Sequence, residues 1–185
     1  VESDIPTIPI VIAILSLLFI IQQYGTKIVG ATFGPMMTLW FSMLAVLGAM
    51  GIWGQWYILK AINPYYAFQL LVNYPGGFWL LGGVFLCTTG AEALYSDLGH
   101  CGRVNIRVSW TYVKAALLLN YFGQGAKLLA LPNGNLGLGK VDPFFQMMPQ
   151  WFLPTGIFIA TIAAIIASQT LITGSYTLVA EAMRL

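Results

Sequence analysis

The chain has 185 residues, of which 58% are hydrophobic and 8% are charged, with a net charge of +2. A soluble domain carries about 25% charged residues, so fourteen charges are too few to cover a water-exposed globule of this length. The scarcity also excludes a nucleic-acid-binding protein, because such proteins present a basic patch. Composition therefore predicts an integral membrane protein or a piece of one.

Five segments are long and apolar enough to cross a bilayer, which requires about 20 mostly apolar residues. They are separated by loops that contain Gly and Pro, and they cover approximately residues 6–24, 31–52, 76–98, 106–129 and 151–180. The predicted fold class is thus all-α integral membrane. Because the chain begins at Val1 without Met and ends directly after Arg184, we expect residues 1–185 to be a piece of a transmembrane domain.

The basic residues predict how these spans are oriented, because Lys and Arg concentrate in cytoplasmic loops. Five spans put the two ends of the chain on opposite sides of the membrane. One side receives Lys27, Arg103, Arg107 and Arg184, and the other receives Lys60 and Lys140, with Lys127 near that border. This modest excess places the N-terminal end outside and the C-terminal end inside.

The loop between the second and third predicted spans contains an aromatic, amphipathic stretch over residues 63–74. It is too short to cross the membrane, and we expect an interfacial or re-entrant helix. An ordinary loop with a hydrophobic anchor is the alternative.

The third predicted span carries two acidic residues, Glu92 and Asp97. A carboxylate at the centre of a bilayer costs at least about 2.5 kcal/mol and is tolerated when it faces a cavity or a partner. Thr88, Glu92 and Tyr95 recur at helical spacing on one face, and Thr89 precedes Glu92 by three residues. Hydroxyl and carboxylate oxygens are ligands for hard cations, so we expect an ion site here. The alternative is a carboxyl group that ties two helices together.

Other polar residues in the spans have more ordinary interpretations. The hydroxyls of residues 168–177 are expected to bond to their own helix, and Asn120 and Gln124 to form interhelical hydrogen bonds. Lys114 is expected to reach the headgroups or to pair with an acid of the third span, and His100 to be interfacial. With one His and two Cys, the chain suggests no zinc or iron–sulfur site. We expect no cofactor and no enzyme.

Several motifs occur in one order along nearly the whole chain. They are GTKIVGATFGPMMTLWF, AINPYYA, GAEALYSDLGH, IRVSW, LLNYFGQGA and ATIAAIIASQTLITGSYTL. Together they resemble the KUP (also called HAK or KT) potassium uptake permeases. The window is similar to that family's fourth to eighth helices, which implies that residues 1–185 are a partial transmembrane transport domain. The family's GDIGTSPLY-type motif, which lies in its first helix, is not in this chain, so part of the expected ion site is missing.

This resemblance implies a transporter fold of the amino acid–polyamine–organocation type, which has two inverted repeats and broken helices. It implies potassium–proton symport by a multi-pass protein of the plasma membrane. Thr89 and Glu92 match the residues that hold the ion in the family's broken helix, and Tyr95 and Asp97 belong to the same motif. The expected partners are a potassium ion, a proton, the lipid bilayer and the helices absent from this chain, with a homodimer as a further option.

Two other functions stay open at this point. One is an amino-acid or polyamine permease of the same fold, which substrate preference distinguishes from a potassium transporter. The other is a non-transporting membrane subunit, in which changes at Thr89 and Glu92 alter assembly and leave flux untouched.

Overall fold

The computed structural model describes residues 27–88, 103–130 and 142–183, together with residues 9, 11–14, 16 and 20. Within these ranges the regular structure is helical, and none of it is β-strand. The chain divides into two compact units, Phe41–Pro154 and a second one formed by Val1–Trp40 with Thr155–Leu185.

Two long helices each contain residues of both units. Helix α2 covers Lys27–Ile52 and α8 covers Leu153–Ala182. Pro35 lies inside α2, where it has no N–H to donate. Pro154, by contrast, lies in the first turn of α8, where a missing N–H costs nothing. The side chains of Ile159 and Ala163 are buried along one stripe of α8.

Two helical segments in the described part of the chain are long and apolar enough to span a membrane. They are Phe33–Ile52 in α2 and Leu153–Ala182 in α8, and they overlap the predicted spans 31–52 and 151–180. Helix α6, Arg103–Leu129, is not among them, because polar residues such as Lys114, Asn120 and Gln124 interrupt its apolar sequence.

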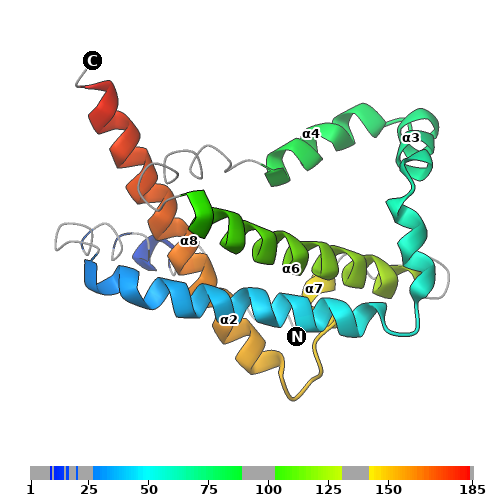
Figure 1. Ribbon diagram of the computed structural model, residues 1–185, viewed down its shortest axis with the longest axis horizontal. Helices are drawn as coiled ribbons and strands as arrows, with labels where there is room; N and C mark the ends of the chain where they lie inside the picture. The colour runs from blue at the N-terminus through cyan, green and yellow to red at the C-terminus, as the bar shows by residue number, and fades with distance from the viewer. Residues whose placement is uncertain are drawn as a thin grey trace. The chain divides into compact units, whose positions relative to one another are not determined.

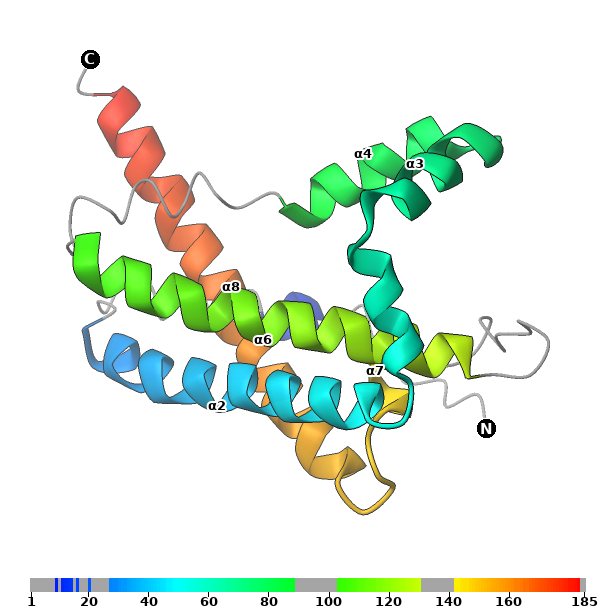
Figure 2. The ribbon, with the colours of Figure 1, turned by 45° about the vertical axis from the view of Figure 1, so that its right-hand side comes forward.

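The unit Phe41–Pro154 contains the end of α2 and five further described elements. In chain order these are η1 (a 3₁₀ helix, Trp56–Ile62), α3 (Pro64–Asn73), α4 (Gly77–Thr88), α6 and α7 (Pro143–Gln146). Within this unit, the part of α2 from Phe41 onward lies beside α6, and the two run in the same direction (Figures 1 and 2). Element η1 contacts the C-terminal part of α6, and α3 connects η1 to α4.

Element η1 is attached to the helix pair by a small apolar cluster. After α2 ends, Gly54 turns the chain with a φ of 85°, a conformation that glycine adopts without steric cost. Ile58 then packs with Ile52 of α2 and Ala126 of α6, and Phe122 covers the cluster. The start of η1 is therefore held at the C-terminal ends of both helices.

Helix α3 confirms that the stretch over residues 63–74 is helical, so an ordinary loop is the wrong description of it. Asn63 is its N-cap, and the backbone N–H of Tyr65 donates to Asn63 Oδ1 at 3.0 Å. Pro64 occupies the first turn, where its fixed φ favours helix initiation. At the other end the N–H of Gly77 donates to the carbonyl of Tyr74 at 2.9 Å, which joins α3 to α4.

Candidate functional site

The predicted ion site lies almost entirely outside the described residues. Thr88 is the last residue of α4, and Thr89, Glu92, Tyr95 and Asp97 all follow it in the range 89–100, as does His100. Their roles stay predictions. The twelve residues of α4 rise about 18 Å, and the chain reaches the predicted ion ligands at the end of this helix.

The described helices pack most closely where α2 meets α6. A Cβ atom added to Gly48 would collide with the backbone of Leu119 and Asn120, and one added to Gly51 would lie 2.8 Å from Gly123 O. Conversely, a Cβ on Gly123 would lie 2.5 Å from Gly48 O. The two backbones touch because three glycines face each other, which is how small residues bring membrane helices together. We call Gly48, Gly51 and Gly123 the glycine seam.

Asn120 lies in this seam and is 5% exposed. Its Oδ1 is buried and accepts no hydrogen bond from the part of the chain that the structure describes. The sequence predicts an interhelical hydrogen bond for this residue. Its burial between α2 and α6 agrees with an interhelical position, but Oδ1 forms no such bond within the described residues. A buried acceptor left in this state costs about 1–3 kcal/mol.

The sequence did not predict one hydrogen bond that joins α2 and α6. The hydroxyls of Ser42 and Tyr112 lie 2.6 Å apart, and the Tyr112 ring packs edge-on against Phe41 with 6.5 Å between the ring centroids. Each hydroxyl is visible in the sequence, but the pairing depends on the register between the two helices, and the two residues are 70 positions apart in the chain. This register also brings Gly48 to Asn120 and Gly51 to Gly123.

The five Ser and Thr hydroxyls of residues 168–177 in α8 behave as the sequence predicts. Each one donates to the carbonyl oxygen four residues earlier, at 2.9–3.0 Å: Ser168 to Ala164, Thr170 to Ile166, Thr173 to Gln169, Ser175 to Leu171 and Thr177 to Thr173. This is the ordinary local bonding of Ser and Thr in membrane helices. These bonds direct the hydroxyls along α8 and do not bring them together as ligands.

Lys114 is exposed on α6, and its Nζ lies 5.3 Å from the centroid of the Trp110 ring. Such a cation–π contact contributes about 0.5–1 kcal/mol at an exposed site. The acids that the sequence offers as its partners lie in the range 89–100, outside the described residues. The ring of Trp110, one turn earlier on the same helix, is the contact that the structure shows.

The comparisons with known proteins decide the family. The family model described as the K+ potassium transporter integral membrane domain matches residues 1–185. The chain belongs to this family. The resemblance to the KUP permeases is thereby confirmed, as is an all-helical membrane domain within the described residues. The family description is that of a transporter and not of an enzyme.

The relatives are similar over nearly the whole chain. A probable potassium transport system protein Kup from Cytophaga hutchinsonii is 64% identical over 100% of this chain and 28% of its own length. Proteins with the same name are 62% identical in Flavobacterium psychrophilum, over 98% of the chain, and 57% identical in Clostridium perfringens, over 95%. The chain thus spans about 28% of the length of these relatives. No solved structure matches it.

Proposed function

We propose that the chain is part of a multi-pass plasma-membrane transporter that takes up potassium together with protons. The observation that carries this proposal is the match of the potassium transporter family model to residues 1–185. The names of the relatives, potassium transport system proteins, point to the same substrate. The potential across the membrane would drive the uptake of a cation with about 2.3 kcal/mol per charge for each 100 mV.

The direction of two helices supports the membrane topology within this proposal. Two spans with one other span between them must cross the bilayer in the same direction. Helices α2 and α6 overlap the second and fourth predicted spans, and they are parallel within the unit Phe41–Pro154. Basic residues lie at the beginning of both helices, namely Lys27 in α2 and Arg103 and Arg107 in α6. The positive-inside rule assigns these beginnings to the cytoplasm.

The proposal extends to an inverted-repeat fold of the amino acid–polyamine–organocation type, with the ion near the bilayer midplane. It rests on the family motifs, which follow one another here in family order. In transporters of this kind, broken helices offer backbone carbonyls to the ion. In this chain the motif that would do so begins beyond α4, after Thr88. Helices outside this chain would complete the site.

Within this site we assign potassium binding to Thr89 and proton coupling to Glu92, with Thr88, Tyr95 and Asp97 as further ligands or supports. Burial favours the neutral form of a carboxyl group, and a nearby cation favours its ionised form. A proton and a potassium ion would therefore act on Glu92 in opposite directions, which is a physical basis for coupling.

The test uses the full-length protein in cells that cannot otherwise grow on low potassium. The unchanged protein should restore growth, and its potassium uptake should increase as the external pH falls. E92Q removes the titrating proton, so uptake should lose this pH dependence. T89V removes a hydroxyl ligand, so half-maximal uptake should require more potassium.

The matched control is T161V on α8, because the Thr161 hydroxyl donates to Ile157 O in its own helix at 2.8 Å. This variant should transport normally. Uptake of labelled amino acids without potassium uptake would instead identify a permease for organic substrates. Unchanged flux together with altered complex formation in E92Q and T89V would identify an assembly subunit. Either result would overturn the proposal.

A further inference from the structure

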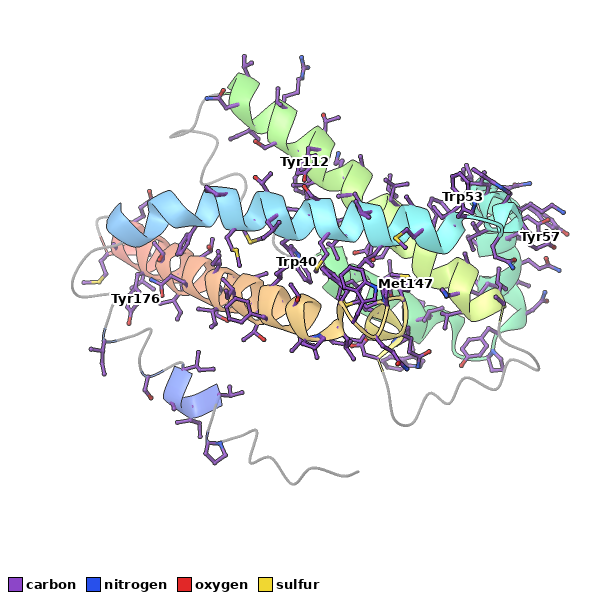
Figure 3. The ribbon with its side chains drawn as sticks, turned by 90° about the horizontal axis from the view of Figure 1, so that it is seen from below. Trp40, Trp53, Tyr57, Tyr112, Met147 and Tyr176 are labelled. Atoms are coloured by element: carbon purple, nitrogen blue, oxygen red, sulfur yellow. The ribbon has the colours of Figure 1, made fainter. Side chains whose placement is uncertain are left out.

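The segment from the end of α2 to the end of α3 leaves its aromatic side chains uncovered. Trp53 is 83% exposed, Trp56 and Tyr57 are each 63% exposed, and Phe68 is 67% exposed. Figure 3 shows Trp53 and Tyr57 where α2 ends and η1 begins. We call residues 53–74 the aromatic arm.

Helix α3 within this arm has no core of its own. It is ten residues long and none of its side chains is buried. Isolated helices shorter than about 12–15 residues are marginal in water. The N-cap and the contact with α4 stabilise only the two ends of this helix. Its length and exposure therefore favour surroundings other than water.

The place where the arm is attached indicates what surrounds it. The apolar segment Phe33–Ile52 has 20 residues, which corresponds to about 30 Å of helix, the thickness of the hydrocarbon core. Trp53 follows this segment directly, and Ile58 fixes η1 to the ends of α2 and α6. The arm therefore starts at the depth where the hydrocarbon gives way to the headgroups.

The side chains of the arm have the chemistry of that layer. Six of its seven aromatic residues carry a polar N–H or O–H group: Trp53, Trp56, Tyr57, Tyr65, Tyr66 and Tyr74. Trp and Tyr concentrate at membrane interfaces because one end of the ring is apolar and the other is polar. Membrane helices that pack against other helices use small residues instead, and in this unit such residues form the glycine seam.

Charge adds a second indication. Lys60 is the only charged residue between positions 53 and 88, and its Nζ lies 4.2 Å from the centroid of the Tyr57 ring. Lys127 lies in the last turn of α6, the helix whose C-terminal part η1 contacts. A basic residue near an anionic membrane surface strengthens binding to that surface by about 1 kcal/mol.

We propose that the aromatic arm is an interfacial anchor, which lies in the headgroup layer at the ends of α2 and α6 and favours anionic lipids through Lys60. The partner is the lipid surface, and the arm does not contact the ion in this proposal. The inference is independent of the transported substrate.

The depth of the arm can be measured by spin labelling of the full-length protein. A cysteine-free version carrying F68C is labelled with a nitroxide and reconstituted in phosphatidylcholine vesicles. Collision rates with oxygen and with a water-soluble nickel complex are calibrated against nitroxide-labelled lipids. We expect a severalfold lower nickel collision rate than in water, retained oxygen collisions, and a depth in the headgroup layer or the upper acyl chains.

Two results would overturn the anchor. An immobilised label that neither reagent reaches would show that protein covers the arm, from the rest of the chain or a second copy. A nickel collision rate equal to that of a label in water would show that the arm is solvated.

The lipid preference has its own test. Adding phosphatidylglycerol to the vesicles should move the F68C label deeper, and K60Q should abolish that shift. K114Q is the matched control, because Lys114 lies on α6 beside Trp110, and it should keep the shift. A shift that persists in K60Q would refute the role of Lys60.

Discussion

The glycine seam and the aromatic arm are two regions of one compact unit, and both are strongly hydrophobic, yet they pack in opposite ways. In the seam, the backbones of α2 and α6 touch at Gly48 and Gly123, and Asn120 beside them is 5% exposed. In the arm, Trp53 projects from the chain with 83% of its surface exposed.

The glycine seam and the aromatic arm pack differently because their residues differ in size more than in hydrophobicity. Lipid chains are as apolar as leucine, so an apolar side chain gains little by leaving lipid for another helix. Small side chains allow backbones to approach and to gain dispersion contacts, whereas large aromatic rings keep helices apart. In this family member, the size pattern therefore predicts which helices adhere, and the polar tips of the aromatic rings predict which segment remains at the surface.

The largest effect that would test this comparison comes from adding one methyl group in the seam and one on α4, the exposed helix that follows the arm. G48A should lower the unfolding free energy by about 3 kcal/mol, at the upper end for overpacking, because the new Cβ meets the backbone of α6, which cannot rotate away. G82A is the matched change on α4, where nothing lies within 4 Å of the new Cβ. It should raise stability by up to about 1 kcal/mol, because alanine favours the helix. Thermal unfolding of the full-length protein in detergent measures both.

The two variants should change the unfolding free energy in opposite directions. Equal losses in G48A and G82A would show that other helices pack against α4 as closely as α6 packs against α2. The contrast between the tightly packed seam and the open surface of α4 would then be wrong.

A smaller loss is expected at the junction of the two regions. Ile58 is 9% exposed and is the buried residue of η1. I58A should lower the unfolding free energy by about 2 kcal/mol, the lower end for a buried Ile→Ala change, because the cluster lies at the end of the helix pair. L59A, at a neighbouring position that is 41% exposed, should stay within about 0.5 kcal/mol.

The same pair of variants also reports on the arm. In I58A, the F68C spin label should become more mobile, since η1 loses its attachment to α2 and α6. An unchanged label spectrum would mean that the lipid surface alone holds the arm in place.

The sequence predicted the class and the family of this protein because both depend on features that are local in the chain. Apolar length indicated a membrane protein, and motifs such as LLNYFGQGA indicated the KUP permeases, which the family model confirms. The bonding of the α8 hydroxyls was predictable for the same reason, because each partner lies four residues away on the same helix.

Features that depend on the register between helices were not predictable in this way. The pairing of Ser42 with Tyr112 and the contact of Gly48 with Asn120 join positions about 70 residues apart. The sequence contains the hydroxyls and the glycines but not the alignment of α2 with α6. For the ion site itself, Thr89 and Glu92 lie outside the described residues, so that prediction depends on transport measurements.

The smallest expected effect concerns the polar group inside the seam. Because Oδ1 of Asn120 is buried and accepts no hydrogen bond from the described residues, the amide costs free energy that an apolar side chain of similar shape would not. N120L should therefore raise the unfolding free energy by about 1 kcal/mol. N120D is the matched control, and it should lower stability, because it places a charge where no partner compensates it. A loss in N120L similar to that in G48A would contradict this prediction: Oδ1 would then have a donor in the full-length protein, and the seam would depend on a polar contact as well as on small residues.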